Sequence, residues 1–230
     1  MKRFYKDTGI AEAEGGFQVQ LDGRPVKTAL GSAQIAPTRS LAETLAAEWD
    51  AQGDKIDPAL FRFRDHVDYT IDMVRPDRAD PIAKLLKYAE TDTLCYRADP
   101  GGHFFARQQE VWDPLLNEFE AREGVMMQRV SGIIHRPQSP EIATQLSNRL
   151  SALDEFALTS LLTMTSLTAS LCIGMSALEA GADAEALWGA ANLEEDWQIE
   201  QWGADYEAQA VRNRRTADFM TAWEFYTLTR

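Results

Sequence analysis

The last 90 residues of the chain contain no proline, and this feature restricts the fold more than any other. Only four glycines interrupt the same stretch. Because proline and glycine are the residues that fit least well inside helices, a long segment nearly free of both is typical of a helical domain. We expect breaks at Gly181 and Gly203, where a helix can end on a left-handed glycine. The expected helices cover residues 141–151, 154–179, 183–202 and 205–228.

The first 38 residues predict β-structure instead. Gly16–Leu21 alternates apolar and polar side chains, which is typical of a half-buried strand. Asp22-Gly23 then supplies a hairpin turn that needs positive φ, and Arg24–Lys27 follows as the return strand. Ser32–Ala36 is a further candidate for a short strand, and Thr38 is the expected N-cap of the helix that comes next.

The middle of the chain is predicted to be mixed. A long helix over residues 104–122 contains Pro114, which should kink or split it. The remaining expected elements are short helices at 65–74 and 81–89, a loop or strand at 91–96, and a strand at 125–130. We therefore predict an α+β protein with a small N-terminal β-rich domain (residues 1–70) and a larger, mainly α-helical domain (residues 71–230).

The charge of the chain limits its partners. The formal net charge is −13, which argues against nucleic acid, because phosphate binding needs clustered Lys and Arg. The one basic cluster, Arg212, Arg214 and Arg215, is expected to flank a helix. Between Leu150 and Val211 there are eleven acidic residues and no Lys, Arg or His. Such a stretch is usually a solvated face, but it can also steer a positively charged partner surface.

The segment over residues 156–178 resembles a membrane span in length only. It carries no charge over 23 residues, but it contains eight Ser and Thr residues and its flanks are acidic. We therefore expect a buried central helix and no membrane insertion. The N-terminus lacks the apolar region of a signal peptide, and Cys95 and Cys172 form no disulfide framework. These features favour a cytoplasmic bacterial protein.

The residues show no recognisable catalytic site. The glycine-rich loops that cradle nucleotide phosphates are missing, so we expect neither nucleotide nor another cofactor. His66, His103 and His135 are isolated in the sequence and predict no metal site. Carboxylates are abundant, however, so a small carboxylate-dependent hydrolase or lyase stays open as an alternative to a binding protein.

A helical wheel gives the most specific indication of a binding surface in the sequence. Drawn through residues 187–202 as one helix, it places Glu194 and Gln198 within a broad apolar arc and Glu195 at its edge. The arc comprises Leu187, Trp188, Ala190, Ala191, Leu193, Trp197, Ile199 and Trp202. A carboxylate in such a face is costly to bury unless it is paired. Glu194 therefore either pairs inside this chain or meets a partner protein.

A set of short motifs follows one another along the chain in a specific order. They are Lys2-Arg3-Phe4-Tyr5, Leu21–Thr28 (LDGRPVKT), Glu48–Gln52 (EWDAQ), Thr91–Ala98 (TDTLCYRA), Gln109–Pro114 (QEVWDP), Leu193–Ile199 (LEEDWQI), Trp202-Gly203 and Asp205-Tyr206-Glu207. This set resembles the F1-ATPase assembly chaperones that bind the α subunit, a family of mitochondria and α-proteobacteria.

The resemblance implies a non-enzymatic chaperone. Its expected partner is the unassembled F1 α subunit, whose surface for the β subunit it would shield before assembly. The resemblance gives most weight to Glu194 as a partner-binding residue. Glu195, Gln198, Trp202 and Asp205 are the further candidates, although Asp205 follows Gly203 more closely here than in some mitochondrial relatives.

Overall fold

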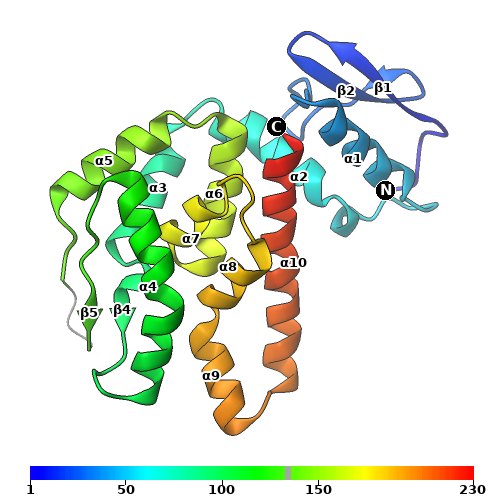
Figure 1. The fold of residues 1–230 in the computed structure, drawn as a ribbon. Helices are drawn as coiled ribbons and strands as arrows, with labels where there is room; N and C mark the ends of the chain where they lie inside the picture. Colours follow the sequence, from blue (N-terminus) through cyan, green and yellow to red (C-terminus); the bar gives the residue numbers. More distant parts are fainter. Residues whose placement is uncertain (133–135) are drawn as a thin grey trace. The chain divides into compact units, whose positions relative to one another are not determined.

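The computed structural model of the chain describes residues 1–132 and 136–230, so His135 lies outside the described residues. The fold is α+β, mostly helical with a small N-terminal antiparallel sheet, which confirms the predicted fold class (Figure 1). The chain divides into two compact units, which are described separately. One comprises Met1–Arg78, Glu155–Ser160 and Glu224–Arg230, and the other comprises Ala79–Asp154 and Leu161–Trp223. A domain boundary after residue 70 stays a prediction.

The first unit contains a three-stranded antiparallel sheet. Its strands are β1 (Thr8–Ala13), β2 (Gly16–Leu21) and β3 (Arg24–Pro25), in the order β1-β2-β3. Asp22 (φ 48°) and Gly23 (φ 75°) form the turn between β2 and β3. The predicted hairpin and its positive-φ turn are therefore confirmed. The strand β1, which the sequence analysis did not delimit, pairs along the whole of β2.

The predicted strand at Ser32–Ala36 is wrong. This segment forms only isolated bridges, from Ala33 to Lys27 and from Ala36 to Phe17. The close approach of Ala36 depends on Gly16, where a Cβ atom would collide with the Ala36 carbonyl oxygen. The segment thus lines the edge of the sheet without extending it.

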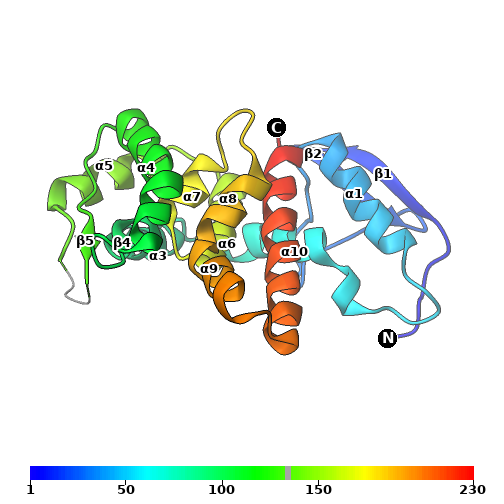
Figure 2. The ribbon, with the colours of Figure 1, turned by 60° about the horizontal axis from the view of Figure 1, so that its bottom comes forward.

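Helix α1 (Arg39–Asp50) covers the sheet of the first unit, as Figures 1 and 2 both show. Its predicted N-cap is confirmed, since the Thr38 hydroxyl accepts the N–H of Leu41 at 3.2 Å. The apolar face of α1 packs on β1, β2 and α2. The buried core of the unit comprises Tyr5, Val19, Leu21, Val26, Ala36, Leu41, Ala42, Leu45, Trp49, Phe61, Val67, Ile71, Phe156 and Phe225.

Glu48 joins α1 to the start of the next helix. Its two carboxylate oxygens accept the N–H groups of Phe63 (2.7 Å) and Arg64 (2.9 Å), which would otherwise be unpaired in the first turn. Burial nevertheless raises the pKa of Glu48. The elements involved are the 3-10 turn η1 (Pro58–Leu60), α2 (Arg62–Tyr69) and the π-helical turn η2 (Thr70–Val74), so a helix is present at the predicted position 65–74.

The second unit is built from helices. It contains α3 (Ala79–Glu90), α4 (His103–Glu123), α5 (Pro140–Ser151), α7 (Leu171–Ser176), α8 (Ala184–Ala191) and α9 (Leu193–Trp202). Helices α6 (Glu155–Thr168) and α10 (Tyr206–Leu228) contribute residues to both units. Helix α7 packs against α3, α4 and α8 and so lies at the centre of the second unit (Figure 2).

Two long helices of the sequence analysis are each divided in the structure. The one expected at 154–179 is interrupted between α6 and α7 by Ala169, with φ 49°, and Ser170. The one expected at 183–202 is interrupted at Asn192, which separates α8 from α9. Conversely, α4 continues through Pro114 without splitting. Both Gly181 (φ 78°) and Gly203 (φ 87°) adopt positive φ, as breaks should.

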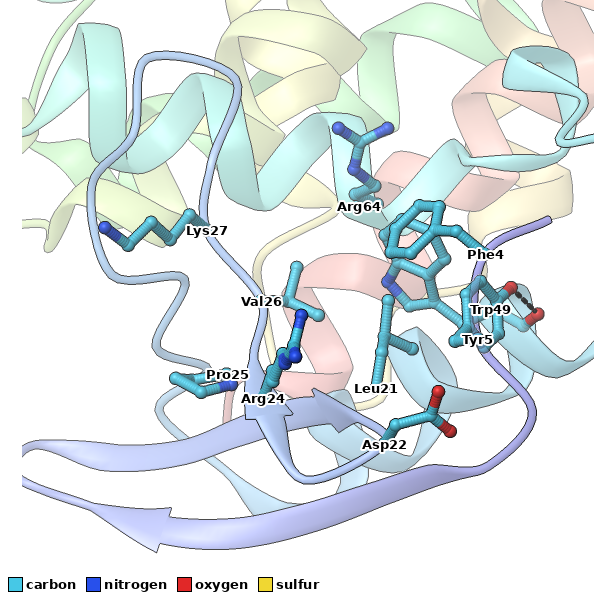
Figure 3. A pocket seen from close by; sticks show the side chains of 10 residues that line it. All are labelled: Phe4, Tyr5, Leu21, Asp22, Arg24, Pro25, Val26, Lys27, Trp49 and Arg64. Carbon is cyan, nitrogen blue, oxygen red and sulfur yellow. Dashed lines mark hydrogen bonds between the residues drawn. The ribbon is translucent and has the colours of Figure 1, made fainter. Parts of the chain in front are cut away.

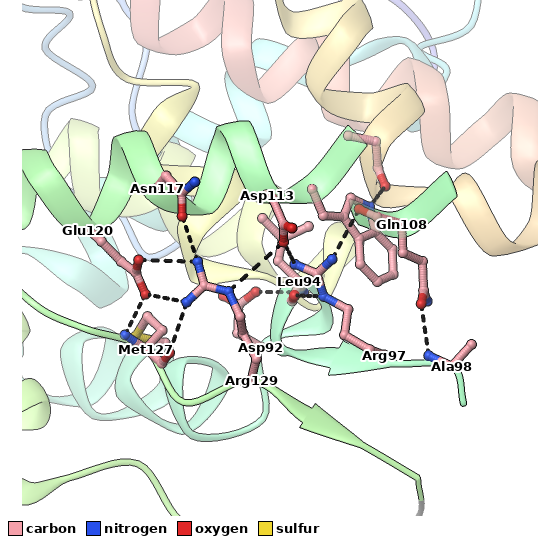
Figure 4. A network of polar contacts seen from close by, with 12 residues as sticks. Asp92, Leu94, Arg97, Ala98, Gln108, Asp113, Asn117, Glu120, Met127 and Arg129 are labelled. Carbon is pink, nitrogen blue, oxygen red and sulfur yellow. Dashed lines mark hydrogen bonds and ion pairs between the residues drawn. The ribbon is translucent and has the colours of Figure 1, made fainter. Parts of the chain in front are cut away.

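The strand expected at 125–130 is reduced to two residues. Strand β5 (Val130–Ser131) pairs in parallel with β4 (Tyr96–Arg97), which follows the 3-10 turn η3 (Thr93–Cys95). Ion pairs hold this region on α4 (Figure 4): Arg97 contacts Asp113 at 2.8 Å and Arg129 contacts Glu120 at 2.9 Å. These charges are therefore engaged in the fold.

Asp92 connects η3 to the start of α7. Its carboxylate accepts the N–H of Leu94 (3.0 Å), the hydroxyl of Ser170 (2.7 Å) and the N–H of Cys172 (2.9 Å). Burial raises the pKa of Asp92, although these hydrogen bonds oppose the shift. Because Ser170 in turn caps α7 through the N–H of Ile173 at 3.1 Å, the acid fixes the point at which α6 ends.

No helix in the described part of the chain is long and apolar enough to cross a membrane. The segment 156–178, expected to be one buried helix, consists of α6 and α7 and is largely buried. Over residues 1–132 and 136–230, no group of three or more His, Cys, Asp or Glu side chains is arranged to hold a metal ion.

Candidate partner-binding site

Helix α9 presents a stripe of exposed side chains. Glu194, Gln198 and Trp202 follow one another at four-residue spacing and are all exposed, Trp202 by 79%. Residues at this spacing lie above one another on one face of a helix. The amide of Gln198 donates to the Glu194 carboxylate at 3.4 Å, within this stripe. We call these three residues the α9 stripe.

The helical wheel that first drew attention to Glu194 is corrected by the structure. Asn192 (φ −103°, ψ 17°) ends α8, so residues 187–202 do not share one helical register. Within α9 only Leu193 is fully buried, while Trp197 packs its ring on Phe104 with centroids 5.5 Å apart. Glu194 therefore lies on the exposed face of α9 and not within a buried apolar arc.

A surface cavity of about 350 Å³ lies beside the α9 stripe. Glu194, Glu195 and Gln198 line one side of it, so three of the five predicted site residues share this cavity. The other lining residues come from the end of α6, the α8–α9 junction, η3 and α10. They are Ser166, Leu167, Thr168, Ala169, Ala191, Asn192, Thr93 and Arg215.

Hydrogen bonds hold the walls of the cavity in place. The Thr93 hydroxyl donates to the carbonyl of Ala169 at 2.9 Å, and Arg215 donates to the carbonyl of Leu167 at 2.6 Å. At the α8–α9 junction, the side-chain amide of Asn192 donates to the carbonyl of Trp188 at 2.8 Å. A wall made of fixed backbone is better ordered than one made of long side chains, so little ordering is needed on binding.

The charges around the cavity are partly neutralised within the chain. Asp196 forms an ion pair with Arg212 at 2.5 Å, and this hydrogen bond raises the pKa of Arg212. Among the described residues, Arg215 is the only cation that lines the cavity, and its guanidinium already donates to a carbonyl. The Glu194 carboxylate is exposed to solvent and accepts a hydrogen bond from the neutral amide of Gln198. A basic or donor group of a partner would complement this carboxylate.

The remaining candidate, Asp205, has a role in the fold. Its carboxylate accepts the N–H of Ala208 at 2.9 Å and so caps the start of α10. Gly203, with φ 87°, turns the chain just before this cap. Tyr206, which belongs to a recognised motif but was not a candidate for partner binding, is 87% exposed four residues after Trp202. The two exposed aromatic residues at the turn between α9 and α10 extend the candidate surface beyond the cavity.

Comparison with known proteins identifies the family. A model of the ATP12 chaperone protein family matches residues 2–120, more than half of the chain. The chain belongs to the ATP12 chaperone family. The matched segment of this ATP12 family member ends before α9, so the match itself includes no residue of the α9 stripe.

Individual relatives match over most or all of the chain. The mitochondrial protein atp12 of Schizosaccharomyces pombe is 26% identical over 224 residues, which cover 92% of this chain and 77% of that protein. The crystal structure of Atp12 from Paracoccus denitrificans has 33% identity and a TM-score of 0.94, covering 100% of this chain and 98% of that one. A protein of Agrobacterium tumefaciens has 36% identity and a TM-score of 0.93, with 100% and 86% coverage.

The ATP12 family consists of F1-ATPase assembly chaperones, and its members are non-enzymatic assembly factors. The family resemblance inferred from the sequence motifs is therefore confirmed. The alternative of a carboxylate-dependent hydrolase or lyase is wrong, even though Glu194 and Glu195 line one cavity. Two adjacent acids beside a cavity do not by themselves indicate acid–base catalysis.

Proposed function

We propose that this chain binds the unassembled α subunit of F1-ATPase and shields the surface that later meets the β subunit. The observation that carries this proposal is the α9 stripe, in which a carboxylate, an amide and an indole are exposed together beside a cavity. A monomeric protein gains nothing in stability by exposing a tryptophan by 79%. Tryptophan is, however, among the residues that contribute most to binding at protein interfaces.

The charge distribution supports a partner with a basic contact surface. Residues 150–211 contain eleven acids and no Lys, Arg or His, and Glu194, Glu195 and Asp205 belong to this segment. A surface of one sign steers an oppositely charged surface towards it and raises the association rate. Contacts of this kind break readily at high ionic strength, which suits a chaperone that releases its client.

Release needs no nucleotide in this mechanism. A free subunit exposes apolar surface that its neighbour covers after assembly, and this surface is prone to aggregation. The chaperone covers it reversibly, and the tighter α–β interface then displaces the chaperone by competition. We propose the cytoplasm of a bacterium as the place of this reaction, since solved structures similar to this chain come from Paracoccus denitrificans and Agrobacterium tumefaciens.

The test of this proposal is the charge reversal Glu194→Lys. The full chain and purified F1 α subunit would be mixed, and complex formation measured by size-exclusion chromatography and titration calorimetry. Reversing the charge of an interface carboxylate typically costs about 2–5 kcal/mol, so we expect affinity to fall by about 30-fold or more. The melting temperature should stay unchanged, because Glu194 is exposed.

Glu200→Lys is the matched control. Glu200 is an exposed acid of the same helix that does not line the cavity, and its reversal changes the net charge equally. We expect the control to bind the α subunit with nearly normal affinity. Equal losses in both variants would reduce the α9 stripe to part of a general acidic surface. Normal binding by Glu194→Lys would remove the proposed role of the site.

A further inference from the structure

Three of the segments that resemble the chaperone family converge on one cavity of the first unit (Figure 3). This cavity has a volume of about 460 Å³. Nine of its ten lining residues belong to the segments Lys2–Tyr5, Leu21–Thr28 and Glu48–Gln52, and the tenth is Arg64. The three segments are far apart in sequence, so the fold itself assembles this surface. None of these residues belongs to the α9 stripe.

The fold explains only part of these segments. The Asp22 carboxylate accepts the N–H groups of Lys6 (3.0 Å) and Asp7 (2.9 Å), which fixes the segment just before β1 beside the hairpin turn. These hydrogen bonds lower the pKa of Asp22. The hydroxyl of Tyr5 donates to the carbonyl of Trp49 at 2.6 Å. These contacts give Asp22, Tyr5 and the Trp49 carbonyl a structural role in the cavity wall.

The exposed members of the same segments have no such structural role. Arg24 and Lys27 are both exposed, and neither forms an ion pair with a residue in the described part of the chain. Phe4 is 60% exposed at the edge of the cavity, in edge-on contact with Tyr5. Neither two exposed cations nor an exposed phenyl ring contributes to the core of the unit. Their place around a cavity indicates a surface that contacts something else.

Unpaired donors lie at the base of the cavity. Trp49 is only 6% exposed, yet its indole N–H has no acceptor, and the Nε–H of Arg64 has none either. In Figure 3 the indole nitrogen lies on the side of the ring that faces Val26 and Arg24. Buried donors are nearly always paired, because leaving one unsatisfied costs about 1–3 kcal/mol.

The charges of the cavity select an anionic occupant. Arg24, Lys27 and Arg64 line it, and Asp22 is the one acid among its described lining residues. Arg64 also pairs with Asp68 at 3.5 Å, and the two charges of Arg24 and Lys27 exceed the single opposite charge of Asp22. This positive site occurs in a chain whose net charge is −13. The positive charge is therefore local to this cavity and is not a general property of the protein surface.

The apolar walls indicate more than a simple anion. Phe4, Pro25 and Val26 offer apolar contact next to the cations, and the volume exceeds the space that a lone carboxylate needs. We propose that this cavity binds an acidic peptide segment of a partner protein. A carboxylate of that segment pairs with Arg24, with Lys27 as a further cation of the cavity, and a neighbouring apolar side chain packs against Phe4 and the Trp49 ring. This binding site is independent of the α9 stripe and of its proposed partner.

The Trp49 indole N–H allows a direct test with the full chain. Its nitrogen–proton NMR signal, assigned with Trp49→Phe, would be followed while the peptide acetyl-Leu-Glu-Phe-Glu-Leu-amide is added. Matched peptides with Gln or Lys in place of Glu serve as probes of charge. We expect a saturable shift of this signal with the acidic peptide. The Gln and Lys peptides should bind with affinities at least about tenfold weaker. Acetate alone should not shift the Trp49 indole signal.

Variants complete the test. Arg24→Glu and Lys27→Glu should each weaken binding of the acidic peptide by about tenfold. Lys55 is an exposed cation of the same unit that does not line the cavity, so Lys55→Glu should leave the affinity for the peptide unchanged. Equal binding of the three peptides, or equal loss in all three variants, would overturn the proposal. A shift produced by acetate would reduce the cavity to a small-anion site. A shift that follows protein concentration without peptide would assign it to a second copy of this chain.

Discussion

Glu194 and Trp202 belong to one exposed stripe of α9 but contribute different forces to binding. The carboxylate offers a charge whose effect depends on the ionic strength, whereas the indole offers apolar area. Trp202 is 79% exposed, so an interface that covers it removes a large apolar surface from water. Removing the indole should therefore affect the complex much more than the free chain.

We expect Trp202→Ala to weaken α-subunit binding by about 2 kcal/mol or more, roughly 30-fold, with an unchanged melting temperature. Calorimetric titration and thermal melting on the same preparation would measure both effects. The control is Met126→Ala, a truncation of another strongly exposed apolar side chain (82%) in the loop after α4. If the control weakens binding equally, the effect is not specific to the α9 stripe.

The sequence predicted the residues of the stripe better than their surroundings. The motif with Glu194 and Gln198 was recognised, but the wheel placed them within an apolar arc, and left open whether that arc is exposed, because it continued through Asn192. The opposite wall of the cavity comes from Thr93, residues 166–169 and Arg215, which are distant in sequence. No local pattern brings such segments together. Their proximity follows from packing, which a single sequence does not show.

At the scale of elements, the sequence located helices well and their interruptions poorly. Helix α5 was expected at 141–151 and is found at 140–151, and α10 was expected at 205–228 and is found at 206–228. The break between α6 and α7 has neither proline nor glycine. It depends on Ser170, which bonds to the buried carboxylate of Asp92 from 78 residues away. A break made by a distant acid has no local signal.

The same break predicts a stabilising substitution. Ala169 adopts φ 49°, a left-handed conformation that costs an L-residue with a Cβ about 1–2 kcal/mol. Glycine has no such penalty, although it loses about 0.5–1 kcal/mol more in conformational entropy. We therefore expect Ala169→Gly to raise the free energy of unfolding by about 0.5 kcal/mol. Chemical denaturation of the full chain would measure the change.

Ala106→Gly is the matched control for Ala169→Gly. Ala106 is an exposed residue within α4, where glycine should destabilise by about 1 kcal/mol. The two substitutions are chemically identical, so opposite signs isolate the effect of the backbone conformation. A loss of stability in both variants would contradict the argument from positive φ.

At the scale of the whole molecule, the net negative charge and the burial of carboxyl groups both favour the folded state as the pH falls. The net charge of −13 disfavours the compact state through self-repulsion, and protonation of carboxylates relieves this repulsion. In addition, burial is the main cause that raises the pKa of four carboxyl groups: Glu48, Asp65, Asp68 and Asp92. These groups bind protons in the folded state at a pH where the unfolded chain still releases them.

The sign of the pH dependence follows from this difference. Between the raised pKa values and the ordinary values of 3.8 for Asp and 4.5 for Glu, the folded state binds more protons than the unfolded state. Its free energy of unfolding therefore increases as the pH falls through that window. Asp22 and Glu141 have lowered pKa values and act oppositely, but only below their ordinary values of 3.8 and 4.5.

We therefore expect the melting temperature to rise as the pH is lowered from neutral towards the ordinary carboxyl pKa values of 4.5 and 3.8, in contrast to proteins whose paired carboxylates make acid destabilising. Melting curves in dilute and in molar sodium chloride separate the two causes, because salt screens the self-repulsion of exposed charges much more than it affects buried groups. A rise that persists in high salt belongs to the four carboxyl groups with raised pKa values, of which Asp68 and Asp92 are buried, Glu48 is half-buried and Asp65 is exposed. A rise only in dilute salt would assign the effect to net charge alone, and a melting temperature that falls steadily over this range would contradict both.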